Sequence, residues 1–305
     1  MRSLDPASPQ RGKGQIMNVT RRRFLTISAA ATLLSGVRYD EYRWAGRALG
    51  AETSLVFRAP KDMAEDTISS VLALVERFEN TFSIYRTASE ISALNQAADV
   101  KPSKLFFELA DYVDEIHRNS NGYFDPTIQS VWGQTHDLTN DQRWQNVTLN
   151  RDRIALPENT KISFNGIAQG FLTDLVAAHL SAHGFKDVLV NFGEFKGIGG
   201  PWNVGLQQPN GLKSIKLNNT AIATSSPDAM RQGNGNSHMI NPFGSEDIEY
   251  KSVSVEHHSA MIADALSTAF VFMSPDKIQN VISKNYPNSR VHLITKDEQM
   301  ISLNA

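Results

Sequence analysis

The sequence of 305 residues contains no cysteine. This absence excludes disulfide bonds, thiolate nucleophiles, and zinc or iron–sulfur sites with cysteine ligands. Clusters of lysine and arginine are missing after residue 36, and that part of the chain holds 24 basic and 31 acidic residues. Because binding to nucleic acid needs clustered cations, no nucleic-acid partner is expected. An anionic ligand would have to be held by a metal ion or by backbone amides.

The sequence also has no apolar run long enough to cross a membrane as a helix. Its apolar stretch from Ile27 to Leu34 falls well short of the about 20 residues that a bilayer requires. This stretch follows residues 20–25 (TRRRFL), a twin-arginine pattern. We therefore interpret residues 1–36 as a leader that the twin-arginine translocase recognises, and expect a periplasmic protein. An ordinary amphipathic helix that begins with arginines is the alternative.

Residues 37–305 are expected to form one domain, because this part contains no internal repeat, low-complexity tract or linker rich in proline, glycine or serine. Apolar residues at helical spacing predict helices. The predicted helices are 61–80, 102–118, 171–183 and 260–274. Short β-rich runs predict strands at 187–192, 202–206, 251–255 and 290–294. This interleaving favours an α/β fold with mixed α+β layers.

The predicted helix 260–274 contains a candidate metal site. Asp264 and Thr268 are four residues apart in an otherwise apolar stretch, and so lie on one face of the helix. Their oxygens suit Mg²⁺, which takes one or two protein groups and completes its coordination with water and phosphate oxygens. Alternatively, Asp264 stabilises the helix dipole and Thr268 bonds back to a carbonyl.

Segment 163–174 (SFNGIAQGFLTD) is expected to be a glycine-bearing loop between an apolar strand and a helix. Gly166 and Gly170 would let the backbone approach a ligand, and the first amides of the helix could bind a phosphate. The segment matches neither a P-loop nor a dinucleotide-binding fingerprint. A turn without any ligand is an equally acceptable interpretation.

The histidines give weaker signals. His179 and His183 have the spacing of zinc ligands on a helix, but the glutamate of a metalloprotease motif is missing, so we interpret them as surface residues. The pair His257-His258 is interpreted as a loop feature. No G-x-S-x-G motif is present, which leaves a serine hydrolase without support.

Five short motifs, in order along the chain, resemble the FAD:protein FMN transferase (ApbE) family. They are residues 48–55 (ALGAETSL), 82–95 (FSIYRTASEISALN), 122–127 (GYFDPT), 238–242 (HMINP) and 265–274 (ALSTAFVFMS). The resemblance extends from Ala48 to Ser274, which is most of the chain after the leader. The resemblance implies a single ApbE-like domain that uses FAD as a substrate.

The resemblance also implies roles for particular residues. The FAD site would include Leu49, Tyr85, Tyr123, Phe124, Asp125, Gln169 and Ile240. The carbonyl of Gly166 would join Asp264 and Thr268 around Mg²⁺. The alternatives are core packing for Phe124 and a turn role for Asp125.

The activity implied by the resemblance is attack by a threonine or serine hydroxyl of a partner protein on the FMN phosphorus of FAD, with release of AMP. His238 is the candidate base, because imidazole titrates near neutral pH. The acceptor would be a flavoprotein of a membrane electron-transfer chain. The leader is similar to that of a family variant that accompanies nitrous-oxide respiration, whose acceptor regulates the reductase.

Two alternatives keep the fold but change the function. Water as the acceptor would make the protein a Mg²⁺-dependent FAD pyrophosphatase. A non-catalytic periplasmic FAD carrier is suggested by Ser163, Gln169 and Glu194, which differ from the residues usual in the family. Retention of Asp264 and Thr268 favours an enzyme.

Overall fold

The computed structural model describes residues 27–28, 40–48, 51–59, 61–134, 136–232, 237–244 and 248–305. The twin-arginine pattern and Leu49 lie outside the described residues. Within the predicted leader, β1 (Ile27–Ser28) pairs antiparallel with β9 (Trp202–Gln208). No helix of the described ranges combines the length and the apolar character that a membrane span needs.

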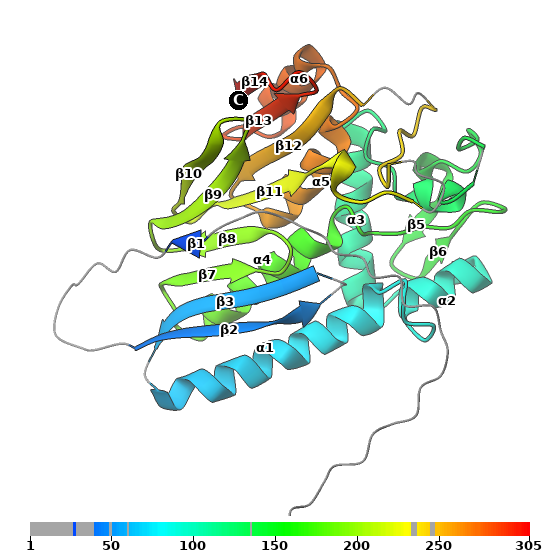
Figure 1. The fold of residues 1–305 in the computed structure, drawn as a ribbon. Helices are drawn as coiled ribbons and strands as arrows, with labels where there is room; N and C mark the ends of the chain where they lie inside the picture. The colour runs from blue at the N-terminus through cyan, green and yellow to red at the C-terminus, as the bar shows by residue number, and fades with distance from the viewer. Residues whose placement is uncertain are drawn as a thin grey trace, which may run out of the picture.

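The centre of the fold is an eight-stranded sheet in the order β14-β13-β12-β11-β8-β7-β3-β2 (Figure 1). Every neighbouring pair in it is antiparallel. The strands are β2 (Asp40–Ala48), β3 (Ala51–Ala59), β7 (Val188–Asn191), β8 (Phe195–Ile198), β11 (Ala221–Ser225), β12 (Tyr250–His257), β13 (Arg290–Thr295) and β14 (Met300–Asn304). The sheet therefore collects strands from both ends of the domain.

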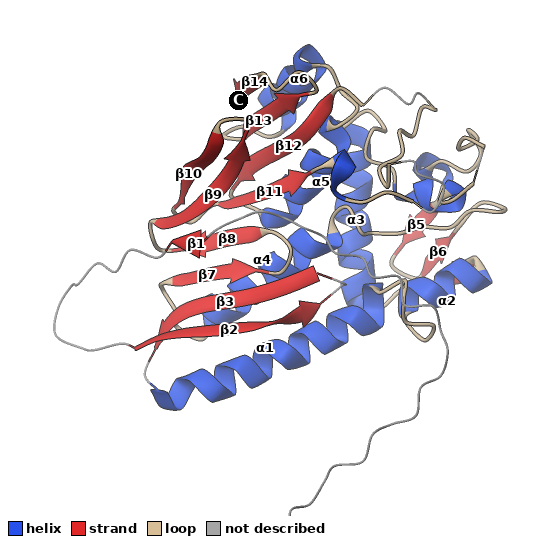
Figure 2. Cartoon of the chain, in the orientation of Figure 1, coloured by secondary structure: helices blue, strands red, loops and turns tan. Residues whose placement is uncertain are grey.

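Helices cover one face of this sheet (Figure 2). The helices are α1 (Lys61–Phe82), α2 (Glu90–Ala97), α3 (Lys104–Asn119), α4 (Ala168–Ala182), α5 (Ala260–Phe270) and α6 (Pro275–Asn285). The short 3₁₀ turns are η1 (Pro126–Val131), η2 (Trp144–Asn146) and η3 (Pro227–Ala229). A small sheet, β4-β6-β5, lies at the side of the helical layer and consists of β4 (Asp99–Val100), β6 (Arg153–Ala155) and β5 (Thr148–Asn150).

The opposite face of the large sheet carries a second sheet, β1-β9-β10, where β10 spans Gly211–Leu217. Two hydrophobic clusters lie on opposite faces of the large sheet, and alternate side chains of the same strands belong to different clusters. Leu55 and Val190 belong to the cluster under the helices, whereas Val56 and Leu189 belong to the cluster under β9 and β10. Because successive side chains of a strand point to opposite faces, the large sheet is the middle layer of three.

The predicted fold class is confirmed, and each predicted helix and strand overlaps one that the structure describes. Two details of the sequence-based prediction are wrong. Helix α4 begins at Ala168, three residues before the predicted start, and residues 160–164 form no strand before it. The amide of Ala168 donates to the carbonyl of Phe164 at 2.7 Å, so a tight turn starts the helix without a side-chain cap.

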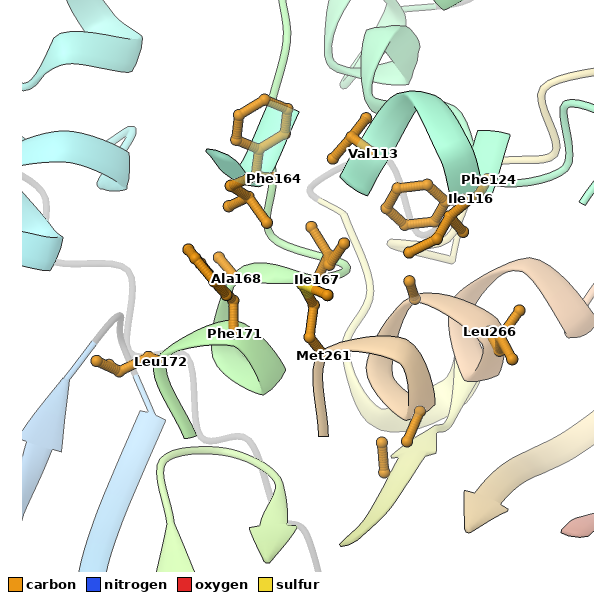
Figure 3. Packing of buried hydrophobic residues seen from close by; sticks show 14 of the residues in the cluster. Val113, Ile116, Phe124, Phe164, Ile167, Ala168, Phe171, Leu172, Met261 and Leu266 are labelled. Atoms are coloured by element: carbon orange, nitrogen blue, oxygen red, sulfur yellow. The ribbon is translucent and has the colours of Figure 1, made fainter. Parts of the chain in front are cut away.

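Helices α4 and α5 approach each other closely in the centre of the helical layer. A Cβ atom on Gly170 would lie 2.3 Å from the carbonyl oxygen of Ala260. Figure 3 places Ile167 and Met261 where the start of α4 meets α5, with Phe124 above them. Buried apolar side chains pack at this contact, and hydrogen bonds place the predicted metal residues beside it.

Candidate functional site

The three predicted metal ligands come together where the turn before α4 faces α5. The hydroxyl of Thr268 donates to the carbonyl of Gly166 at 3.3 Å. Asp264 lies one helical turn before Thr268 on α5 and is 3% exposed. The predicted proximity of the carbonyl, the hydroxyl and the carboxylate is therefore met by the fold.

Gly170 fixes the orientation of the Asp264 carboxylate. Its amide donates to Oδ2 of Asp264 at 3.0 Å. We expected Gly170 to let the backbone approach a ligand. The atoms that lie close to Gly170 are instead backbone atoms of α5. The amides of Ala168 and Gly170 are both bonded within the protein, which leaves fewer amides at the start of α4 for a phosphate than predicted.

The donor set fits a hard divalent cation. It consists of one carboxylate, one hydroxyl and one backbone carbonyl, all of them oxygen donors of the kind that Mg²⁺ takes. A Cβ atom at residue 166 would lie 3.1 Å from Oγ1 of Thr268, so a larger residue would crowd the hydroxyl. The described residues contain no cluster of three histidines or acids, so a zinc-type site is not formed among them.

Two serines that the sequence did not indicate support this site. The hydroxyl of Ser225, at the end of β11, lies 2.8 Å from Oγ of Ser267 and 3.4 Å from Oγ1 of Thr268. Ser225 therefore links the sheet to the face of α5 that carries the predicted ligands. Nothing in the local sequence around Ser225 indicates this contact, because its partners lie more than 40 residues further along the chain.

The GYFDPT segment borders the same site. A Cβ atom on Gly166 would lie 3.3 Å from the ring of Phe124, which is buried. Asp125 is also buried and accepts hydrogen bonds from the amide of Thr127 at 2.9 Å and from the amide of Trp144 at 3.3 Å. Burial raises the pKa of Asp125, and the hydrogen bonds from Thr127 partly offset this rise. These contacts agree with a core role for Phe124 and a turn role for Asp125.

Phe243, the residue that follows the HMINP segment, packs against the GYFDPT segment. The rings of Tyr123 and Phe243 are 4.9 Å apart, and the guanidinium of Arg143 lies over Phe243 while it donates to the carbonyl of Pro242 at 2.9 Å. His238 and Ile240 are half-buried in the same loop. Two of the predicted flavin-binding segments are thus brought side by side.

Gln169 lies on the other side of α4. Its side chain is buried against Gly193, which has a φ of +103°, and a Cβ atom there would lie 2.6 Å from the amide carbon of Gln169. Next to it, the carboxylate of Glu194 accepts a hydrogen bond from the amide of Thr224 at 3.2 Å. Gln169 and Glu194 therefore pack against the backbone of the large sheet.

Among the predicted site residues that the structure describes, Tyr85 has the exposed side chain, at 77%. Its motif is nevertheless tied to the site. The side chain of Asn95 donates to the carbonyl of Ile162 at 2.9 Å and accepts from its amide at 2.8 Å. This pair of bonds fixes the segment that leads to Gly166.

His179 on α4 and His183, the C-cap residue of α4, have ring centroids 4.3 Å apart with the rings tilted by 42°. His179 lies 2.8 Å from the hydroxyl of Ser70, and burial lowers its pKa. Neither histidine belongs to a metal-type cluster among the described residues.

A cavity of about 820 Å³ opens elsewhere, between β10 and the strands β12 to β14. Its walls include Lys213, Glu256 and His292, and none of the predicted site residues that the structure describes. The predicted chemistry and this cavity are therefore separate features.

His257 makes a testable contribution to the pH dependence of stability. Burial, together with the neighbouring His258, lowers its pKa from 6.5 to about 4, although Asp174 acts in the opposite direction. Its Nδ1 accepts a hydrogen bond from the amide of Ser259 at 3.1 Å, which requires this nitrogen to be unprotonated. As the pH falls below 6.5, the unfolded chain takes up a proton that the folded chain refuses, so the free energy of unfolding decreases until the pH reaches about 4.

We expect His257→Asn, which retains an acceptor for the amide of Ser259, to remove about 2 kcal/mol of this acid destabilisation. Urea unfolding at pH 7.5 and pH 5 measures the effect. The exposed His136, which does not contribute to the lowered pKa of His257, provides the control variant His136→Asn. Equal pH dependence in His257→Asn and the unaltered protein would contradict the assignment.

Comparisons with known proteins agree with the motif order and with the geometry. Curated relatives described as FAD:protein FMN transferases include one from Haemophilus influenzae, 26% identical over 279 residues that cover 77% of this chain and 80% of the relative. Another, from Vibrio cholerae, is 24% identical over 309 residues, which cover 87% of this chain and 91% of the relative.

Solved structures show the same fold. The apo form of the flavinyl transferase ApbE of Pseudomonas stutzeri has a TM-score of 0.75 at 21% identity and covers 88% of this chain and 96% of its own. An ApbE protein from Thermotoga maritima has a TM-score of 0.75 at 22% identity, with 87% and 97% covered. A model of the ApbE family matches residues 49–293, which is most of the sequence. The chain therefore belongs to the ApbE family.

Proposed function

We propose that this chain is an FAD:protein FMN transferase that attaches FMN from FAD to a threonine or serine of an acceptor flavoprotein and releases AMP. One observation carries the proposal: the carbonyl of Gly166 and the side chains of Asp264 and Thr268 converge at the contact of α4 with α5. This convergence occurs in a member of a family whose curated relatives are described as FAD:protein FMN transferases.

In the proposed reaction, the acceptor oxygen forms a bond to the FMN phosphorus, and the bond from this phosphorus to the bridging oxygen breaks. AMP leaves with the bridging oxygen, and the hydroxyl proton passes to a base. Gly166, Asp264 and Thr268 would hold Mg²⁺, which when bound neutralises charge on the pyrophosphate oxygens. The amide of Gly170 and the hydroxyl of Ser225 keep the two side-chain ligands in place.

His238 is the proposed base. Its Nδ1 lies 2.9 Å from the carbonyl of Met230. Because a carbonyl can only accept, Nδ1 carries the hydrogen, and the neutral ring has its lone pair on Nε2. This tautomer supports a role for Nε2 in taking the proton of the acceptor hydroxyl.

The flavin contacts are proposed from the arrangement of the segments. The ring of Tyr123 packs edge to face against the ring of Phe243, which follows the HMINP segment. Ile240 and His238 belong to the same loop as Phe243. Gln169 lies at the start of α4, three residues after Gly166. Leu49, Tyr85, Phe124 and Asp125 are added to the proposed set on the family resemblance alone.

The proposed place of action is the periplasm, after export by the twin-arginine translocase. The support is the twin-arginine sequence pattern in residues 20–25. The proposed acceptor is a flavoprotein of a membrane electron-transfer chain, and a regulator of nitrous-oxide reductase is a candidate.

One assay tests the proposal against its two alternatives. The purified chain is incubated with FAD, Mg²⁺ and a candidate acceptor domain, and the acceptor is then denatured. Flavin fluorescence that stays with the denatured acceptor, together with free AMP, supports the transferase. Free FMN and AMP without labelled acceptor would show a pyrophosphatase, and unaltered bound FAD would show a carrier; either result would replace the proposed function.

A further inference from the structure

Asp174 joins three elements of the fold at one carboxylate. It lies in the second turn of α4, and its Oδ2 accepts hydrogen bonds from the hydroxyl of Ser259 at 2.6 Å and the amide of Met261 at 3.0 Å. Its Oδ1 accepts from the amide of Ala260 at 3.0 Å and from the ammonium of Lys196, on β8, at 2.6 Å. The carboxylate of one helix thus caps the first amides of another.

This cap and the predicted metal ligand are held by the same face of α4. Gly170 and Asp174 are four residues apart, so they lie one above the other on that helix. The amide of Gly170 bonds to Asp264, and Asp174 bonds to the residues that begin α5. Two points of attachment fix both the position and the rotation of α5 relative to α4.

Asp174 itself is not available as a cation ligand. Each of its oxygens already accepts two hydrogen bonds, and the side chain of Lys196 compensates its charge. The Asp174 and Lys196 side chains are 19% and 20% exposed, so this pair is largely shielded from solvent. Its effect on a bound cation must act through the placement of α5.

We propose that Asp174 is the positioning residue of the cation site, because it holds α5 where Asp264 and Thr268 face the carbonyl of Gly166. The inference rests on the proposed function, since it concerns the same site. Without the carboxylate, the first amides of α5 lose their partner, and besides the apolar packing the hydrogen bond from Gly170 to Asp264 is left to fix α5 against α4. The ligands would then be less well preorganised for a divalent ion.

The test uses Mn²⁺ as the probe, with its free concentration followed by electron paramagnetic resonance on the whole chain. We expect Asp174→Ala to weaken Mn²⁺ binding by about tenfold to a hundredfold, the range seen when a residue that orients metal ligands is removed. Asp174→Asn keeps one acceptor oxygen, so its Mn²⁺ affinity should lie between that of the unaltered chain and that of Asp174→Ala. Melting temperatures are measured for every variant.

A matched variant separates positioning from general destabilisation. Ser103 caps α3 by accepting from the amide of Phe106 at 3.2 Å. Ser103→Ala should lower the melting temperature and leave Mn²⁺ affinity within about twofold, because a cap on another helix stabilises only that helix. A positioning role predicts that Asp174→Ala weakens Mn²⁺ binding whereas Ser103→Ala only lowers the melting temperature.

Two results would overturn the inference. If the unaltered chain binds Mn²⁺ and Asp174→Ala binds it equally well, the positioning role is wrong while the proposed function stands. If Asp174→Ala does not fold, unchanged affinity in Asp174→Asn excludes the positioning role instead. Absence of Mn²⁺ binding by the unaltered chain would remove the proposed metal site, and the inference with it.

Discussion

Asp264→Asn is expected to reduce the rate of FMN transfer by about a thousandfold, which corresponds to about 4 kcal/mol of barrier. The amide oxygen of asparagine can still accept the hydrogen bond that the amide of Gly170 now donates at 3.0 Å. The substitution removes the negative charge that would hold a divalent cation. Because Asp264 is buried, loss of its charge should leave the melting temperature unchanged or raise it.

Asp264→Ala provides the comparison. It should lose activity to the same extent and also lower the free energy of unfolding by about 1–3 kcal/mol, since the amide of Gly170 would have no acceptor there. Asp152→Asn, at an exposed carboxylate paired with Lys101, serves as the control that retains full activity. Transfer activity above a tenth of the original in Asp264→Asn would exclude the carboxylate as the ligand on which the reaction depends.

Gly170→Ala should lower the free energy of unfolding by about 3 kcal/mol or more. Alanine favours a helix over glycine by about 1 kcal/mol, so propensity alone predicts the opposite sign. The added Cβ would lie 2.3 Å from the carbonyl oxygen of Ala260 and 2.7 Å from Cα of Met261, both backbone atoms that cannot move aside alone. Helices α4 and α5 would have to separate, which also disturbs the bond to Asp264.

Gly133→Ala is the matched control for this experiment. Gly133 has a φ of +75° and no heavy atom within 4 Å of an added Cβ, so alanine there meets only backbone strain. That strain costs about 1 kcal/mol. Urea unfolding measures both variants. A smaller loss for Gly170→Ala than for Gly133→Ala would contradict the close approach of the two helices.

Periodic patterns made much of the fold predictable. The apolar residues Ile68, Val71 and Val75 recur at helical spacing because one side of α1 faces the core, and the structure places them within that helix. The start of α4 was not predictable in this way. Its N-cap is Ile167, which has no side chain that can accept a hydrogen bond, so the usual polar signal for a helix start is absent.

From residue spacing alone, the site was predictable only where its residues are neighbours in the sequence, and the part of Gly166 was implied by the family resemblance. Asp264 and Thr268 share a helix face, and a spacing of four residues reveals that directly. The role of Asp174 could not be inferred, because its partners on α5 are 85 to 87 residues away. The same holds for Gly170, which looks like a ligand-binding glycine until the backbone of α5 is placed against it.

The separation in sequence of the oxygens at this site limits when it can form. Thr268 meets the carbonyl of Gly166 across 102 residues, and Gly170 meets Asp264 across 94. Closing such long loops costs chain entropy, and non-local contacts of this kind slow folding. A growing chain on the ribosome therefore cannot complete the cation site until α5 has emerged, and any shorter fragment should be unable to assemble it.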